Sequence, residues 1–296
     1  MADSEPTLSS SKKLMIAAAP MTFVLLWSTG FLGAKYGMPY AEPFTFLAYR
    51  FTITSLLFFI VLSVMRVPWP RDRQTWVHAT IVGLLMHGVY LAAVFFAVDN
   101  GTSGGISALI VGVQPVLTAV FAGLVLSERL SRKAWFGMAL GFVGITLVVW
   151  QQAGDTGGWI GITSCITGLI GVTVATLYQK KYGTTIDLRV GSTIQFGAAA
   201  IMMWVFALAF ESLHIEWNTQ IILTMIWMVM VLSVGAVTLL YVLIRRGAAS
   251  KVASLFYLVP PTVAIETYFL FGETLTPMAL LGMGVAVIGV ALVTKG

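Results

Sequence analysis

A repeat within the chain constrains its fold more than any other feature of the sequence. Residues 108–150 align with residues 253–295 without a gap at a constant offset of 145, and 11 of the 43 aligned pairs are identical. The connection Glu128–Lys133 in the first copy is basic, whereas Glu273–Met278 in the second copy contains no basic residue. In membrane proteins, Lys and Arg concentrate in the cytoplasmic connections. If the chain lies in a membrane, the two copies therefore have opposite orientations.

The composition indicates that the chain does lie in a lipid bilayer. Of its 296 residues, 58% are hydrophobic and only 10% are charged, with a mean hydropathy of +0.91, whereas soluble domains carry about 25% charged residues. The net charge of +5 comes from basic residues in short loops between apolar stretches. Orientation in the membrane explains them, so no nucleic-acid partner is expected. The single cysteine, Cys165, excludes an intrachain disulfide and a cysteine-based metal site.

Ten stretches are long and apolar enough to cross a bilayer, which takes about 20 helical residues. Their short connections make neighbouring helices antiparallel. In this arrangement 15 of the 17 Lys and Arg residues fall on one side, Lys35 falls on the other, and Arg50 lies within a span. This distribution predicts that both termini are cytoplasmic. The predicted spans are Leu14–Gly33, Pro43–Met65, Gln74–Val98, Thr102–Leu126, Arg132–Trp150, Gly157–Tyr182, Leu188–Phe210, Asn218–Ile244, Ser250–Phe271 and Thr276–Thr294.

The two halves must be inverted relative to each other, because each contains an odd number of spans. We therefore predict an all-α membrane protein of ten transmembrane helices, with residues 1–151 as the first five-helix repeat and residues 152–296 as the second. Neither half is expected to fold alone, since it would expose a polar inner face to lipid. Small residues four apart on spans 5 and 10 allow close helix contacts. These spans could use the small residues to form a dimer or to pack within each half, and we favour packing within the molecule.

Several residues resemble the pattern of a known family. The matching positions are Trp27, Lys35, Pro43, Arg50, Phe51 and two paired elements, Pro115 with Ser127-Glu128 and Pro260 with Gly272-Glu273. Together with ten spans in two halves, they resemble the EamA-type branch of the drug/metabolite transporter superfamily over nearly the whole chain. The resemblance implies a carrier whose central cavity is lined by helices 1, 3, 4, 6, 8 and 9, with helices 5 and 10 at the periphery. Bacterial members of this family include exporters of amino acids and related metabolites.

Three prolines are candidate hinges. Pro115 lies near the middle of span 4, and Pro260 and Pro261 lie near the middle of span 9. Proline removes a helical hydrogen bond, and irregular backbone at this depth is tolerated only where it faces protein or a water-filled cavity. The alternative is a static bend, because proline is frequent in membrane helices. The symmetric placement of the prolines favours hinges.

The candidates for substrate contact are Trp27, Arg50, His87, Tyr90, Gln114 and Glu266. An ionisable residue inside a membrane span is a functional candidate by default. His87, halfway along span 3 with Tyr90 one turn away, could carry a proton or donate to a carboxylate; the alternative is a neutral core histidine. Arg50 and Glu266 lie at similar depths and could pair, or Arg50 could bind a substrate carboxylate. Gln114 either lines the cavity or bridges two helices.

These features predict a secondary transporter of the bacterial-type cytoplasmic membrane that exports small organic metabolites, amino acids in particular, by alternating access. No ATP-binding motif such as G-x-x-x-x-G-K-[ST] occurs, and we expect no cofactor, no metal and no enzymatic activity. A drug or nucleotide-sugar carrier of the same superfamily is an alternative, although a nucleotide sugar would need several cations in the cavity. An intramembrane enzyme is another, but His78, His87 and His214 form no H-E-x-x-H motif. Proton antiport and facilitated diffusion both remain open, as does the oligomeric state.

Overall fold

The protein is an all-helical membrane protein. The computed structural model describes residues 10–102, 107, 110–149, 158–271 and 276–295. Within these residues the structure is helical apart from connections and one isolated bridge between Ala41 and Ile215. A helix pairs its backbone groups internally, as a hydrocarbon environment requires. Six helical stretches in the described part are long and apolar enough to cross a membrane: Pro43–Val64, Arg73–Asp99, Gly158–Tyr182, Leu188–Phe210, Thr219–Arg246 and Ala249–Leu270.

The described helices fall on the predicted ranges, but several ranges are interrupted. The continuous helices are α1 (Ser10–Gly37), α2 (Pro43–Val64), α7 (Arg132–Val149), α8 (Gly158–Tyr182), α9 (Leu188–Phe210) and α14 (Pro277–Lys295). The interrupted ranges contain α3 (Arg73–Gly83), η2 (Leu84–Val89) and α4 (Tyr90–Asp99); α6 (Gln114–Val125); α10 (Thr219–Trp227), η3 (Met228–Ala236) and α11 (Val237–Arg246); and α12 (Ala249–Ser254), η4 (Leu255–Leu258) and α13 (Val259–Phe271). The segments η2 and η3 are π-helical, whereas η4 and η1 (Met38–Tyr40) are 3-10 helices.

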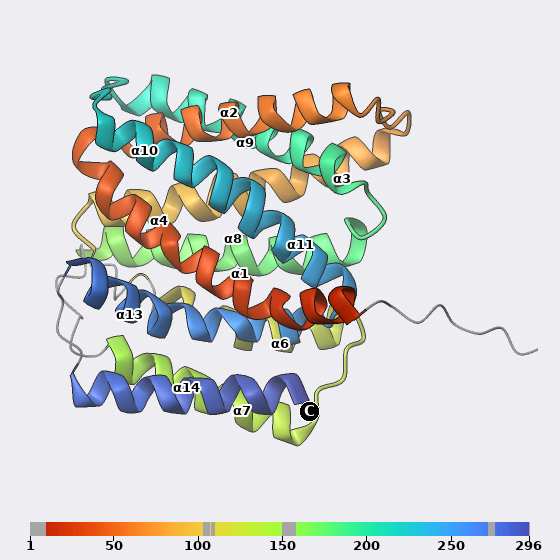
Figure 1. The fold of residues 1–296 in the computed structure, drawn as a ribbon, viewed down its shortest axis with the longest axis vertical. Coiled ribbons are helices and arrows are strands. Elements are labelled where there is room, and N and C mark those ends of the chain that lie inside the picture. Colours follow the sequence, from red (N-terminus) through yellow and green to blue (C-terminus); the bar gives the residue numbers. More distant parts are fainter. Residues whose placement is uncertain (1–9, 103–106, 108–109, 150–157, 272–275, 296) are drawn as a thin grey trace, which may run out of the picture.

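The helices lie side by side in one bundle (Figure 1). The pair α2 and α9 forms one edge, the pair α7 and α14 forms the opposite edge, and α1, α4, α8 and α11 lie between them. Aromatic side chains such as Phe23, Phe51 and Phe196 are fully buried between the helices, whereas Leu124 and Phe269 are exposed on the outside. Apolar side chains on the outside are what a lipid-facing surface needs.

The helices α7 and α14 approach each other closely through glycines. A Cβ atom on Gly289 would lie 2.5 Å from the backbone nitrogen of Gly141 and 2.6 Å from the carbonyl oxygen of Gly137. A Cβ atom on Gly144 would lie 2.7 Å from the carbonyl oxygen of Gly282. The two helices therefore pack on each other within the molecule, but they come from different halves of the repeat, whereas packing within each half was expected. Their position at the edge of the bundle agrees with the family resemblance.

Three carboxylates tie distant segments together at the helix ends. Glu211 accepts hydrogen bonds from the backbone N–H groups of Phe44 (2.7 Å) and Thr45 (2.6 Å) at the start of α2. Glu128 does the same for Ala249 (2.8 Å) at the start of α12. Helix N-termini favour such negative charges. Glu42 accepts from the N–H groups of Ser212 and His214. Burial raises the pKa of the Glu42 carboxyl, but these two donors together hold that pKa below its ordinary value.

Candidate functional site: a central cavity

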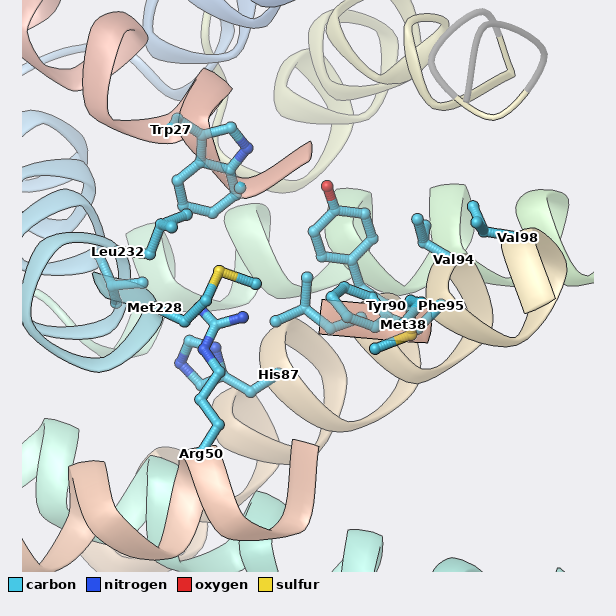
Figure 2. Close-up of a pocket in the computed structure, with 13 residues that line it drawn as sticks. Trp27, Met38, Arg50, His87, Tyr90, Val94, Phe95, Val98, Met228 and Leu232 are labelled. Carbon is cyan, nitrogen blue, oxygen red and sulfur yellow. The ribbon is translucent and has the colours of Figure 1, made fainter. Parts of the chain in front are cut away.

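A small cavity of about 70 Å³ lies in the middle of the bundle. Its walls come from α1, η1, α2, α4, α11 and the two π-helical segments η2 and η3. Figure 2 shows Arg50 and His87 side by side at one end, Trp27 across from them, and apolar side chains of α4 along the wall. Four of the six predicted substrate-contacting residues therefore line one cavity: Trp27, Arg50, His87 and Tyr90.

Arg50 provides a buried positive charge in this cavity. Its side chain is only 3% exposed. Its Nε donates a hydrogen bond to the Ser233 hydroxyl at 3.0 Å, and none of the described carboxylates lies within ion-pair distance of it. A guanidinium group has five N–H donors in a planar fork that fits a carboxylate. Burying such a charge without a counter-charge is costly, which is why an unpaired arginine at this depth indicates an anion site.

His87 closes one end of the cavity. Its Nε2 lies 3.2 Å from the Tyr241 hydroxyl, and its ring stacks on Phe196 with centroids 4.2 Å apart and planes 17° apart. The histidine is 1% exposed and Tyr241 is equally buried. Both the cavity role and the core role considered from the sequence are therefore compatible with its position, because the ring lines the cavity and is held by neighbours on α9 and α11.

The two π-helical segments occupy corresponding positions in the repeat. In the early spans the offset of the repeat is 146, as between Lys35-Tyr36-Gly37 and Lys181-Tyr182-Gly183. Adding 146 to η2 (Leu84–Val89) gives residues 230–235, which lie within η3 (Met228–Ala236). A π-helical turn leaves backbone groups outside the regular α-helical pattern and is frequent at functional sites. His87 lies in η2 and Ser233, the partner of Arg50, lies in η3. The cavity is thus built around the two irregular segments, which the sequence analysis did not predict.

Trp27 and Tyr90 form the aromatic part of the wall. Trp27 is 7% exposed, and its ring meets that of Phe256 edge-on at 5.3 Å between centroids. Tyr90 is 4% exposed and begins α4 directly after η2. Aromatic side chains pinned in this way offer rigid apolar surface to a ligand. Met228 and Leu232 of η3 add flexible apolar surface on the opposite side.

Gln114 lies outside the lining of this cavity. It is fully buried at the start of α6. Its Nε2 donates to the Thr118 hydroxyl at 3.2 Å and reaches the Thr176 hydroxyl of α8 at 3.5 Å. This geometry corresponds to the alternative of a residue that bridges two helices.

Glu266 also lies away from the central cavity, and the predicted pair with Arg50 is not formed. The Ser28 hydroxyl lies 2.6 Å from Glu266 Oε1, whereas Arg50 bonds to Ser233. Glu266 instead lines a larger cleft between α1, α10 and α13. The two residues line different spaces in the bundle, Arg50 the central cavity and Glu266 the cleft, and their similar depth in the membrane stays a prediction.

The prolines begin helical segments instead of kinking continuous helices. Pro115 stands in the first turn of α6, after a turn at Gly112–Val113. Pro260 and Pro261 stand in the first turn of α13, directly after the 3-10 segment η4. A first turn needs no N–H from these positions, so proline fits there at little cost. Both predicted spans are interrupted at corresponding positions, whereas a hinge motion remains a proposal.

Sequence reasoning missed Ser233, Tyr241 and Phe196. Two of the three could have been found from the repeat, because at an offset of 146 Arg50 corresponds to Phe196 and His87 corresponds to Ser233. The contact of Arg50 with Ser233 in one half of the site thus has its counterpart in the contact of Phe196 with His87. No signal in the sequence distinguishes Tyr241 from other tyrosines.

Known proteins resemble this chain over nearly its whole length. An uncharacterized transporter of Bacillus subtilis, YvbV, is 26% identical over 91% of this chain and 88% of its own length. An uncharacterized inner membrane transporter of Escherichia coli strain K12, YedA, is 24% identical over 96% of this chain and 92% of its own. A probable amino-acid metabolite efflux pump of Salmonella typhimurium is 24% identical over 88% of both chains.

The fold and the family are equally clear. A crystal structure of a protein 19% identical in sequence superposes with a TM-score of 0.80 over 97% of this chain and 98% of that one, so the two share a fold. The sequence model of the EamA-like transporter family matches twice, at residues 14–150 and at residues 159–295. The protein is therefore a multi-pass membrane transporter that belongs to the EamA-like transporter family.

Proposed function

We propose that this transporter is a secondary carrier that exports small organic metabolites with a carboxylate group, amino acids in particular. The observation that carries the proposal is Arg50, a buried guanidinium that faces the central cavity without a carboxylate partner among the described residues. A substrate carboxylate would supply the missing counter-charge through charge-assisted hydrogen bonds. The relative named as a probable amino-acid metabolite efflux pump supports both the substrate class and the direction.

The rest of the lining favours apolar side chains on the substrate. Met228, Leu232, Val94 and Phe95 surround the space next to Arg50. An amino acid would thus direct its carboxylate to Arg50 and its side chain toward these residues. A drug-like or nucleotide-sugar substrate is the alternative. The paired phosphates of a nucleotide sugar would meet only one arginine among the described lining residues, which favours the amino acid.

Alternating access supplies the mechanism. Ligand pockets are typically about 300–1,000 Å³, so a cavity of about 70 Å³ must widen before it can hold an amino acid. The π-helical segments η2 and η3 and the interruptions before Pro115 and Pro260 are the places where regular helical hydrogen bonding is already broken. We propose that the helices bend at these places to open the cavity first on one side of the membrane and then on the other.

An inverted repeat gives the two gates. In our proposal, residues 1–151 and 152–296 each form five spans, ten in all, with both termini cytoplasmic. Cavity-lining residues Met38 and Val98 then lie toward the outside, and the contact of His87 with Tyr241 closes the cytoplasmic side. At the offset of 146, Tyr241 corresponds to Phe95 on the outer side. These two aromatic residues would exchange the roles of closed and open gate.

The topology can be tested with reporter fusions. We expect fusions after Arg71 and Arg129 to report a cytoplasmic location and fusions after Asp155 and Glu211 to report an external one, because 15 of the 17 basic residues fall on one side. The fusion after Asp155 is the most sensitive, since it lies at the junction of the two halves. A cytoplasmic signal there would rule out inverted five-span halves.

The substrate class is tested by counterflow in proteoliposomes. Vesicles containing the purified protein and an excess of one unlabelled amino acid should transiently accumulate the same amino acid in labelled form. Leucine, phenylalanine and glutamate distinguish apolar from acidic side chains, and a nucleotide sugar and a lipophilic cation represent the alternative carriers. We expect counterflow of the apolar amino acids. Exchange of only the nucleotide sugar or only the cation would refute the proposed substrate class, and empty vesicles control for leakage.

A further inference from the structure

A second cleft, separate from the central cavity, contains Glu266. It encloses about 760 Å³ between α1, α10 and α13, and α1 packs against both of the other helices (Figure 1). A similar cleft of about 560 Å³ lies between α6 and α8. The two clefts are related by the repeat, because four lining residues of the first have counterparts among the lining residues of the other: Leu32 and Tyr36 at the offset of 146, and Glu266 and Leu270 at the offset of 145.

The two clefts differ in the charged residue that lines each of them: Glu266 lines the first and Lys181 lines the second. The counterpart of Glu266 is Phe121, and that of Leu270 is Val125. The second cleft thus forms with an apolar residue at the same position, so the architecture itself does not need a carboxyl group there. A carboxyl group inside a membrane span is costly and is functional by default. Glu266 therefore calls for a chemical explanation.

Ser28 can form a hydrogen bond with Glu266 Oε1 in both protonation states of the carboxyl group. The Ser28 hydroxyl lies 2.6 Å from Glu266 Oε1 and 2.8 Å from the Leu25 carbonyl oxygen. A hydroxyl carries a single proton, so it donates to only one of these oxygens at a time. If Glu266 is ionised, Ser28 donates to it. If Glu266 is protonated, Glu266 can donate to Ser28, and Ser28 then donates to Leu25. The position of one proton thus decides how α1 is hydrogen-bonded.

The surroundings of Glu266 favour a proton over a metal cation as its ligand. Its Oε2 is buried and has no hydrogen-bond partner among the described residues. The nearby Thr29 hydroxyl already donates to the Leu26 carbonyl and accepts from the Trp227 indole. Hard cations such as Ca²⁺ gather about six to eight oxygen ligands, many more than the carboxyl group and Ser28 supply. A single proton removes the charge of the carboxylate without further ligands, and on Oε1 it lies within hydrogen-bond distance of Ser28.

Few other charged groups face Glu266. Tyr36 of α1 is the other titratable residue among the described lining of the cleft, and the α10 face contributes the neutral Gln220 and Thr219. On α13 itself, Tyr268 is exposed, and Tyr257 of η4 packs toward Gly141 of α7.

The remaining charges of the neighbouring helices lie farther away. Arg132 and Lys133 are in the first turn of α7 and Lys295 is in the last turn of α14. Because the two helices are antiparallel in their glycine contacts, the start of α7 lies near the end of α14. Glu266 lies near the other end of α14, five residues before α13 ends. On α1, Lys35 precedes Tyr36 in the sequence, and its side chain is outside the described part.

The helix α1 connects this cleft to the central cavity. Ser28 contacts Glu266, whereas its neighbours Trp27 and Gly30 line the cavity. We propose that Glu266 is the proton-coupling site of the transporter. In this mechanism, a proton from the outer solution adds to a carboxylate oxygen of Glu266, Ser28 turns from Glu266 to the Leu25 carbonyl, and α1 with Trp27 shifts toward the other access state. The proton leaves to the cytoplasm when that state opens, so substrate and proton move in opposite directions. This inference rests on the proposed export function.

The first test measures coupling separately from substrate exchange. In proteoliposomes with equal pH on both sides, amino-acid counterflow by the E266Q variant should stay within about twofold of the parent. With an imposed gradient, the parent's steady-state accumulation should change about tenfold per pH unit for one proton per substrate. E266Q should show no such change, and E266D should retain it. Glu216→Gln, an exposed carboxylate of the outer loop, is the matched control and should behave like the parent.

The second test does not depend on transport. The infrared carbonyl band of protonated carboxyl groups in the purified protein should lose one titrating component in E266Q and keep it in E216Q. If the parent protein shows no amino-acid counterflow but its infrared spectrum contains the titrating component of Glu266, the proposed function is refuted and the proton site is not. An unchanged infrared titration in E266Q, a full response of E266Q to the pH gradient, or loss of its counterflow at equal pH with normal thermal stability would each overturn the coupling role.

Discussion

Transport of amino acids should fall by about two orders of magnitude when Arg50 is replaced with glutamine. Loss of one partner from a buried, charge-assisted contact costs about 2–5 kcal/mol, and each 1.4 kcal/mol is a factor of about ten. Glutamine keeps a polar side chain of similar length but lacks the positive charge and the planar fork of donors. The measurement is the initial rate of counterflow against amino-acid concentration in proteoliposomes, which separates lost affinity from lost maximal rate.

Two controls decide what such a loss means. Ser233→Ala removes only the acceptor of the Arg50 Nε and should lower transport less than R50Q does, since the guanidinium keeps its charge and its other N–H donors. An amino amide lacks the carboxylate and should be a poor substrate of the parent. Its counterflow rate should differ little between the parent and the R50Q variant. Undiminished amino-acid transport by a well-folded R50Q protein would show that the guanidinium does not bind the substrate.

Replacing Gly289 with alanine should destabilise the protein by about 1–3 kcal/mol, the usual cost of forcing an extra methyl group into a packed contact. The new Cβ would lie 2.5 Å from the Gly141 nitrogen and 2.6 Å from the Gly137 carbonyl oxygen. Backbone atoms cannot turn away as a flexible side chain can, so α7 and α14 would have to separate. Thermal unfolding in detergent, followed by circular dichroism, measures the effect.

Gly284 provides a matched control on the same helix. No atom lies within 4 Å of a Cβ built at this position, and α14 exposes it. Gly284→Ala should leave the unfolding temperature unchanged or raise it slightly, because alanine stabilises a helix by about 1 kcal/mol relative to glycine. Equal effects of the two alanines would mean that the close contact of α7 with α14 does not hold the edge of the bundle together.

The sequence predicted those residues of the candidate site that are unusual inside a membrane span. Arg50 and His87 are ionisable residues inside apolar stretches, and such residues are rare enough in a membrane to be noticed one at a time. Tyr90 and Trp27 were found through their neighbours and the family resemblance. Gln114 was a candidate on the same grounds, but its Nε2 reaches two hydroxyl groups on α6 and α8, and its side chain is not part of the cavity lining. A polar residue's depth therefore does not reveal whether it faces the cavity or another helix.

The sequence by itself determined that this chain is an all-helical membrane protein, where its helices fall and which family it belongs to, because apolar length and charge asymmetry are properties of the chain read in order. It also predicted similar depths for Arg50 and Glu266 from the rise of about 1.5 Å per helical residue. Only the tertiary structure decided that Arg50 bonds to Ser233 and Glu266 to Ser28. Helices that are apolar on every side carry no stripe to show which face turns inward, so the rotation of each helix, and the π-helical turns that form the cavity, depend on how neighbouring helices pack.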